Sequence, residues 1–113
     1  MTTSPPAIAR IWRGRTTLAM ADEYAAYLLA NGLQPLVDNA LAVQMFRENR
    51  EDDTEFVTIS WWESVDAMSR FAGDDPTRIH HLARDEEYLI ELPEGVQVLE
   101  IIASHGITTH ARE

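Results

Sequence analysis

Residues 55–73, EFVTISWWESVDAMSRFAG, join a β-strand pattern directly to a helix pattern. The β-branched and aromatic residues of 55–62 predict a strand. Ser64 is a favoured residue for the N-terminal cap of a helix, and Gly73 is suited to the point where a helix stops. The sequence therefore predicts a strand over 55–62 that runs directly into a helix over 65–72.

The residues on the N-terminal side of this stretch predict a hairpin partner for the strand. Residues 41–47, LAVQMFR, have a strand pattern of their own. The link 48–54, ENREDDT, is polar and charged, which suits an exposed loop. Its carboxylates allow an alternative interpretation as a cation site, but charge runs of this kind mostly lie in solvent. We therefore expect a solvated hairpin loop.

The first part of the chain predicts a strand followed by a helix. In the strand pattern of residues 8–15, even-numbered side chains share one face and odd-numbered side chains share the other. Arginine falls on both faces, with Arg10 on the first and Arg13 and Arg15 on the second. Such arginines either extend into water at a strand edge or hold an anion at the mouth of a pocket. Residues 17–31 are rich in Ala, Leu and Tyr and predict the best helix of the chain. Gln34 and Pro35 then predict a connection to the next strand.

The last part of the chain completes an α+β pattern. Asp75 followed by Pro76 predicts a further helix over 76–86, and residues 96–103 predict the last strand. The order β-α-β-β-α-(α)-β is typical of a ferredoxin-like split βαβ fold. We expect a four-stranded antiparallel sheet with its helices on one face.

A single domain is expected to fill most of the chain. We expect a disordered leader over residues 1–7, one domain over 8–103 and a C-terminal tail over 104–113.

Composition excludes several classes of protein. The 113 residues carry a formal net charge of −10 and contain neither cysteine nor lysine, so that all nine residues counted as positively charged are arginines. Disulfide scaffolds, cysteine-bound metals and thiol nucleophiles are thereby excluded. The acidic balance argues against nucleic acid as a partner, and no apolar run is long enough for a membrane span. The first residues lack a signal-peptide pattern, so we expect a cytoplasmic protein.

The strands carry apolar residues on both faces, which points to a partner. Phe56 and Trp62 fall on one face of their strand, whereas Val57 and Ile59 fall on the other. Because helices are expected on one face only, the second face would expose more apolar surface than monomers usually do. We therefore expect a homodimer formed through the open sheet face.

Residues 60–75, SWWESVDAMSRFAGDD, resemble the antibiotic biosynthesis monooxygenase superfamily. The Trp-Glu-Ser at the end of the strand and the Phe-Ala-Gly-x-Asp that closes the helix carry the resemblance. Residues 11–15, IWRGR, followed by an Ala- and Tyr-rich helix, are also similar. The resemblance extends over roughly residues 8–103. It implies a dimeric α/β barrel in which each subunit holds a ligand between its sheet and its helices.

The same resemblance implies a cofactor-independent monooxygenase that acts on a small aromatic or polyketide-like molecule. Members of this kind deprotonate an anthrone or a hydroquinone, and the carbanion then passes an electron to O₂. Such a reaction needs an aromatic pocket, a proton acceptor and positive charge beside the developing oxyanion. No cofactor and no metal are expected.

Candidate site residues follow from these needs. Because the chain has no lysine, side-chain positive charge can come only from arginine or histidine. We expect His81 to accept the proton and Arg13 and Arg15 to hold the developing anion, with Arg10 as a further choice on the same strand. The substrate-binding residues that we expect are all aromatic: Trp12, Tyr24, Tyr27, Trp62 and Phe71. These aromatic side chains are alternatively plain core or dimer-interface residues, and His81 is alternatively a surface histidine.

Two other functions remain open at this point. One is a non-catalytic small-molecule-binding or interaction protein with the same dimeric fold. The other is heme binding or degradation, because one branch of the superfamily has a heme-ligating histidine in the corresponding helix, and His81 falls nearest to that position. That branch also has an asparagine in the first strand and a tryptophan in the second helix, where this chain has residues 13–15, RGR, and Phe71.

The remaining histidines give weak signals. His80 precedes His81, and neighbouring side chains of a helix do not face one pocket together. His105 and His110 have no helical spacing and no third ligand nearby, so we expect no metal site there.

Overall fold

The computed structural model describes residues 5–75, 77 and 81–106. In chain order the elements are β1 (Ile8–Thr16), the short 3₁₀ helix η1 (Leu18–Met20), α1 (Ala21–Asn31), α2 (Leu33–Asn39), β2 (Ala42–Asn49), β3 (Thr54–Trp62), α3 (Val65–Ala72), α4 (Asp85–Tyr88) and β4 (Gln97–Glu100). Within these residues, no helix is both long enough and apolar enough to cross a membrane.

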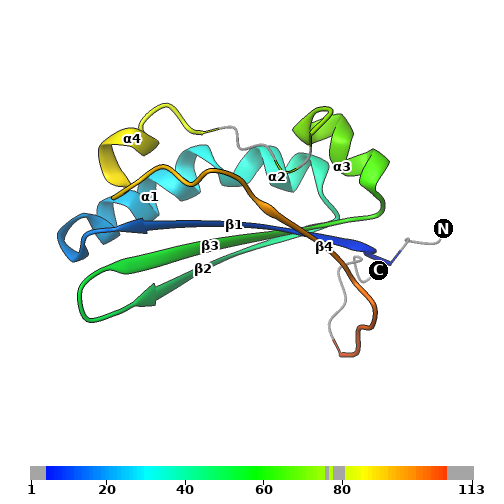
Figure 1. Cartoon of the computed structure of the whole chain (residues 1–113), viewed down its shortest axis with the longest axis horizontal. Helices are drawn as coiled ribbons and strands as arrows, with labels where there is room; N and C mark the ends of the chain where they lie inside the picture. Colours follow the sequence, from blue (N-terminus) through cyan, green and yellow to red (C-terminus); the bar gives the residue numbers. More distant parts are fainter. Residues whose placement is uncertain (1–4, 76, 78–80, 107–113) are drawn as a thin grey trace.

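The four strands form one antiparallel sheet in the order β2-β3-β1-β4. Figure 1 shows the helices α1 to α4 on one side of this sheet. The predicted α+β class and four-stranded antiparallel sheet are therefore confirmed, and the arrangement is compatible with a ferredoxin-like fold.

The strand-to-helix stretch at 55–73 folds as its sequence predicts. β3 ends at Trp62, and the hydroxyl of Ser64 accepts a hydrogen bond of 3.0 Å from the backbone nitrogen of Ala67. Gly73 follows α3 with a φ of 94°, a left-handed conformation that glycine adopts without a steric penalty. The cap and the stop residue therefore set both ends of α3.

The helical region after β1 differs from the prediction. One helix was expected over 17–31, whereas the chain forms η1, α1 and then a second helix, α2, where a connection was expected. Pro35 is the third residue of α2, and the backbone nitrogens of a first helical turn have no partner within the helix. A proline is therefore tolerated there, and α2 continues the helix layer above the sheet.

The helix predicted over 76–86 lies partly outside the described residues. In the part that is described, His81 and Leu82 are not helical, and the helix α4 begins only at Asp85. Asp85 is 2% exposed, and its carboxylate accepts a hydrogen bond of 2.9 Å from the backbone nitrogen of Leu82. This side chain holds the turn that precedes α4.

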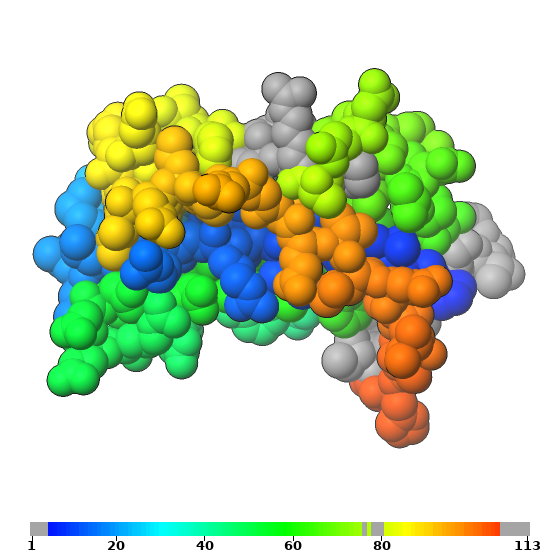
Figure 2. Space-filling view, viewed as in Figure 1, coloured from blue at the N-terminus to red at the C-terminus, as the bar shows by residue number. Residues whose placement is uncertain are grey.

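The last strand is shorter than the predicted 96–103. β4 pairs only with the first half of β1, and Glu100 lies opposite Ile8, where β1 begins. The nitrogen of Ile101 still donates to the carbonyl oxygen of Ala7, at 2.8 Å. Beyond that point the neighbouring strand offers no further residues for pairing. Figure 2 shows the segment that leads from α4 to β4, in yellow and orange, crossing the front of the molecule.

Glycine at position 14 is required by the packing of Trp12. A Cβ atom added at Gly14 would lie 2.6 Å from Cη2 and 2.8 Å from Cζ2 of the Trp12 indole, and 3.2 Å from Cδ2 of Leu89. Real Cβ atoms do not approach other carbons so closely, so the indole lies directly over the Gly14 backbone. The missing side chain thus fixes where the Trp12 ring can lie.

This close approach predicts that Gly14→Ala destabilises the protein by about 1–3 kcal/mol, because the new methyl group overlaps the indole. In a Trp12→Phe background the two closest ring atoms are gone, and the same substitution should cost clearly less. Urea unfolding of the four proteins measures both costs. Equal costs in the two backgrounds would show that the indole does not limit position 14.

Candidate functional site

A cavity of about 300 Å³ lies between the sheet and the helices. Its volume is at the lower end of the range for small-molecule sites. Its floor is formed by side chains of the three strands β1, β2 and β3: Arg10, Trp12, Met45, Thr58 and Ser60. Its roof and walls include side chains of the helices and of the segments around α4: Tyr24, Leu28, Leu36, Phe71, His81, Leu82, Asp85 and Val96.

The cavity lies where two parts of the core meet. One buried cluster is built around Tyr24, Phe56 and Tyr88, and the other around Ile8, Trp62 and Met68. Trp12, Met45 and Leu82 pack against the first cluster, whereas Leu36 and Phe71 pack against the second. All five of these partly buried side chains line the cavity. The helix layer therefore does not close completely over the middle of the sheet.

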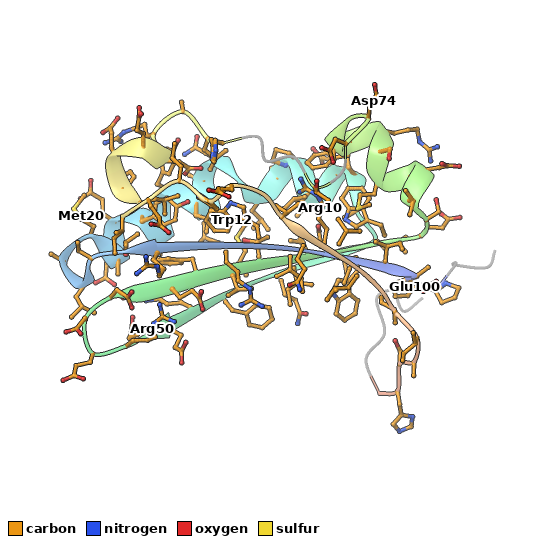
Figure 3. All side chains as sticks on the ribbon, viewed as in Figure 1. Arg10, Trp12, Met20, Arg50, Asp74 and Glu100 are labelled. Atoms are coloured by element: carbon orange, nitrogen blue, oxygen red, sulfur yellow. The ribbon has the colours of Figure 1, made fainter. Side chains whose placement is uncertain are left out.

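Strand register brings the floor residues together. In the antiparallel pairing, Arg10 lies opposite Ser60, and Trp12 lies opposite Thr58. Met45 of β2 lies opposite Thr58 on its other side. Residues directly opposite each other share a face of the sheet, so all five side chains point toward the helices. Figure 3 shows Arg10 and Trp12 extending from β1 toward the helix layer.

A buried carboxylate and a tyrosine hydroxyl form the polar end of the cavity. The hydroxyl of Tyr24 donates a hydrogen bond of 2.9 Å to Oδ1 of Asp85, and both residues line the cavity. Tyr24 is fully buried, and Asp85 is 2% exposed. Burial, together with the negative charge of Asp85, raises the pKa of the Tyr24 phenol far above its usual value. The phenol therefore stays protonated and remains a donor to the carboxylate.

Arg10 supplies positive charge to the cavity floor. Its side chain is partly buried, and burial lowers the pKa of its guanidinium. The usual pKa of arginine is so high that the group remains charged at neutral pH. A guanidinium in such a partly desolvated place interacts with an anion more strongly than it would in open water.

Thr58 brings a hydroxyl without a partner to the same floor. Its Oγ1 atom is fully buried and has no hydrogen-bond partner within the described part of the chain. The neighbouring hydroxyl of Ser60 differs, because it accepts a hydrogen bond of 2.9 Å from Nε1 of Trp62. Buried polar groups are nearly always hydrogen-bonded in folded proteins, so the Thr58 hydroxyl is an exception that needs a reason.

Four of the predicted site residues line the cavity. They are Trp12, Tyr24, Phe71 and His81. The first three come from β1, α1 and α3, and His81 lies in the segment before α4 with its side chain exposed. The structure thus brings together part of the predicted aromatic set and the predicted proton acceptor.

Two predicted aromatic residues lie beside the cavity rather than on its surface. Trp62 is 1% exposed, and its ring centroid is 5.3 Å from that of Phe71, which does line the cavity. The Tyr27 ring packs against that of Tyr24, and its hydroxyl accepts a hydrogen bond of 2.8 Å from the backbone nitrogen of Arg84. These two side chains support the lining residues from behind.

Arg13 and Arg15 lie away from the cavity. Their odd positions place them on the face of β1 opposite to Arg10 and Trp12. They border a smaller hollow of about 180 Å³ together with Glu55 and Glu91. Two carboxylates in that hollow oppose the binding of an anion, so the geometry gives Arg13 and Arg15 no place beside a ligand of the larger cavity.

Arg15 instead holds the hairpin between β2 and β3. Its Nη1 atom lies 2.8 Å from Oδ2 of Asp53, and Nε of Arg50 lies 2.8 Å from Oδ1 of the same carboxylate. The hydrogen bonds from Arg50 and then Arg15 lower the pKa of Asp53 from 3.8 to about 2. The strand-end interpretation therefore fits this arginine.

Among the lining residues that were not predicted as site residues, Arg10 and Asp85 carry charge and Thr58 carries a buried hydroxyl. Arg10 was named only as a further choice, although the alternation of β1 already placed it on the same face as Trp12. Thr58 follows from the same alternation once β1 and β3 are paired in register. Asp85 had no local signal, because its contact with Tyr24 spans 61 residues of sequence.

The described residues contain no group of three His, Cys, Asp or Glu side chains that is suited to hold a metal ion. His80 and His110 lie outside the described residues, and His105 is exposed near the C-terminal end of the described chain.

No protein-family model matches the chain, and no curated protein matches it.

The Asp53 ion pairs predict an acid-sensitive component of stability. A carboxylate whose pKa is lower in the folded state than in the unfolded state stabilises the protein at pH values above the unfolded-state pKa. This contribution is lost as the pH falls to the folded-state pKa. Asp53→Asn should therefore lower stability at pH 5 and lose most of this effect near pH 2.

Urea midpoints measured between pH 5 and pH 2 test this expectation. Asp52→Asn is the matched control, because it removes an exposed carboxylate from the same loop. An effect of Asp53→Asn that stays constant with pH, or one that Asp52→Asn reproduces, would contradict it.

Proposed function

We propose that the cavity binds a small aromatic molecule and that the protein is a cofactor-independent monooxygenase-type enzyme. The observation that carries this proposal is the convergence of Trp12, Phe71, Arg10 and His81 on one cavity. Aromatic walls, one cation and one imidazole are the groups that proton removal from an aromatic substrate needs. The resemblance of residues 60–75 to the antibiotic biosynthesis monooxygenase superfamily supports the same reaction class.

The substrate would lie on the strand floor with its ring against Trp12 and Phe71. Both side chains offer broad apolar surface, and neighbouring Leu28 and Leu82 extend it. Rings that pack in offset or edge-on geometry gain energy beyond simple burial. The cavity is small enough that a bound ring system would be held in few orientations, which favours reaction.

His81 is the proton acceptor in this proposal. For an anthrone-type substrate it takes a proton from the activated CH₂ carbon, and the resulting carbanion reduces O₂. Over the whole reaction that carbon gives two protons and four electrons to one O₂ molecule. One oxygen atom becomes a carbonyl on the carbon, and the other leaves as water with both hydrogens, including the proton that His81 held.

Arg10 stabilises the oxyanion that forms during deprotonation. Removing the proton moves negative charge onto the substrate oxygen, and a guanidinium beside that oxygen lowers the barrier. Arg10 takes the role expected earlier of Arg13 and Arg15, because Arg10 is the arginine of β1 that lines the cavity.

We also propose that two chains associate through the outer face of the sheet, defined by Ala9, Ile11, Phe46, Val57, Ile59, Trp61 and Leu99. These side chains share the face that the helices leave uncovered (Figure 1). Phe46 is 44% exposed and Leu99 is 41% exposed, although both are large and apolar. Exposed apolar patches of this kind are typical of association surfaces, and pairing of two such sheets would form a dimeric α/β barrel.

Oxygen uptake with an anthrone substrate and no added cofactor tests the enzymatic proposal. Arg10→Gln should lower kcat/KM by about 100-fold, because it removes the cation beside the developing oxyanion. Arg13→Gln removes the same charge from the opposite face of the same strand and should leave the rate unchanged.

Circular dichroism of both variants confirms that they fold. Equal losses of kcat/KM in the two variants would overturn the role assigned to Arg10. Oxygen uptake by the wild type no faster than in buffer alone would overturn the enzymatic proposal. Saturable ligand binding without uptake would favour the non-catalytic binding protein instead.

Sedimentation over a micromolar concentration range tests the dimer. Ile59 lies on the inner strand β3 opposite Ile11, so Ile59→Arg would place a charge in the middle of the outer face and should give monomers. Leu29→Arg is the control, because Leu29 is 56% exposed on α1 and lies on the helix side of the molecule. A wild type that stays monomeric, or an Ile59→Arg variant that still dimerises, would contradict the proposal.

A further inference from the structure

The hydroxyl of Thr58 is a polar group of the cavity floor that the proposed reaction does not use and that, unlike the Ser60 hydroxyl, has no hydrogen-bond partner in the described part of the chain. Thr58 is 6% exposed and lies on the inner strand β3, between Trp12 on one side and Met45 on the other. Its side chain lines the cavity, and its Oγ1 is buried with no partner in the described part of the chain. A hydroxyl placed between an indole and a thioether contributes nothing to their packing.

Such a hydroxyl destabilises the protein on its own. Folding removes it from water, and no protein hydrogen bond within the described residues replaces the lost one. Valine has nearly the same shape and would avoid this penalty at the same position. A ligand oxygen that accepts the Thr58 proton would recover the missing hydrogen bond, which gives the hydroxyl a role in binding.

The surroundings of Thr58 favour a negatively charged oxygen. Arg10 lies diagonally across from Thr58 on β1, a spacing of about 7–8 Å in antiparallel sheets that a long side chain bridges. A guanidinium carries five N–H donors, of which one or two suffice for a ligand oxygen. Thr58 and Arg10 can therefore both donate to one group on the cavity floor.

The opposite end of the cavity repels negative charge. The Tyr24 ring packs edge-on to Phe56 at 5.1 Å, and Phe56 lies opposite Gly14, four residues along β1 from Arg10. Four residues of a strand span about 13 Å, so the Asp85 carboxylate that Tyr24 holds lies toward the far end from Arg10. An anionic ligand would therefore lie with its charge toward Arg10 and its ring toward Tyr24.

We propose that Thr58 Oγ1 and the Arg10 guanidinium together bind an anionic oxygen attached to the ligand's aromatic ring, and that Thr58 selects ligands that carry such an oxygen. A ring carboxylate and a ring phenolate share this chemistry. The inference rests on the proposed use of the cavity for ligand binding, but it does not depend on oxygenation.

Calorimetric titration with three naphthalene probes tests the inference. The probes are 2-naphthoate, 2-naphthol and 2-methylnaphthalene, which share one ring system and differ in the group that meets Thr58. The wild type should bind 2-naphthoate at least tenfold more tightly than 2-methylnaphthalene. Tight binding of 2-naphthol as well would show that a phenolic oxygen is also accepted, whereas weak binding would restrict the site to carboxylates.

Thr58→Val separates a binding role from a structural one, because the two readouts should move in opposite directions. Loss of the unpaired hydroxyl should raise Tm by a few degrees. Loss of the donor should weaken 2-naphthoate binding by about tenfold and leave 2-methylnaphthalene binding unchanged. Thr58→Ser keeps the hydroxyl and should retain 2-naphthoate binding. Thr58→Ala is a second hydroxyl-free variant should valine not fit.

Three results would overturn the inference. They are no saturable binding of 2-naphthoate by the wild type, unchanged 2-naphthoate binding in both hydroxyl-free variants, and an equal loss for 2-naphthoate and 2-methylnaphthalene. The last result would mean that Thr58 acts only through packing. Thr58-dependent binding of 2-naphthoate in a protein that consumes no oxygen would instead support the inference and reject the oxygenase.

Discussion

The antiparallel register between β1 and β3 is the constraint on which the cavity depends. It places Arg10 beside Ser60 and Trp12 beside Thr58, all on the face that the helices cover. A shift of one residue would turn each of these side chains to the other face, because side chains alternate along a strand. The floor of the cavity would then lose the positive charge of Arg10 and the hydroxyl of Thr58 together. Gly14 adds a second condition, because the Trp12 ring occupies the space that a side chain at position 14 would need.

A buried polar contact joins two parts of the layer that covers this floor. The Tyr24 hydroxyl donates to Asp85, and the same carboxylate accepts from the backbone of Leu82. α1 and the turn before α4 are therefore fixed to each other at the edge of the cavity. Removing one partner of a buried hydrogen bond costs more than the bond itself contributes, since the other partner stays desolvated. Tyr24 and Asp85 thus shape the cavity wall. The negative charge of Asp85 makes this end of the cavity differ from the end that carries the Arg10 guanidinium.

The order of strands and helices could be read largely from local patterns, and the site only in part. Ser64 and Gly73 set the ends of α3 as their residue types predict, whereas α2 was missed because Pro35 suggested a connection. Trp12, Tyr24, Phe71 and His81 were identified as site residues and do line the cavity. Arg13 and Arg15 were preferred to Arg10 although alternation had already separated them. The aromatic face of β1 was the better guide, because the larger cavity lies between that face and the helix layer.

The sequence by itself determined the class of fold, the absence of thiol and lysine chemistry, and the alternation that sorts β1 into two faces. These properties are local, because they depend on residue type and on the two-residue period of a strand. Only the tertiary structure decided which face became the cavity floor, that the Thr58 hydroxyl lies there with no partner among the described residues, and that Asp85 lines the same cavity. Such features arise from contacts between residues far apart in the chain, and no local pattern records them.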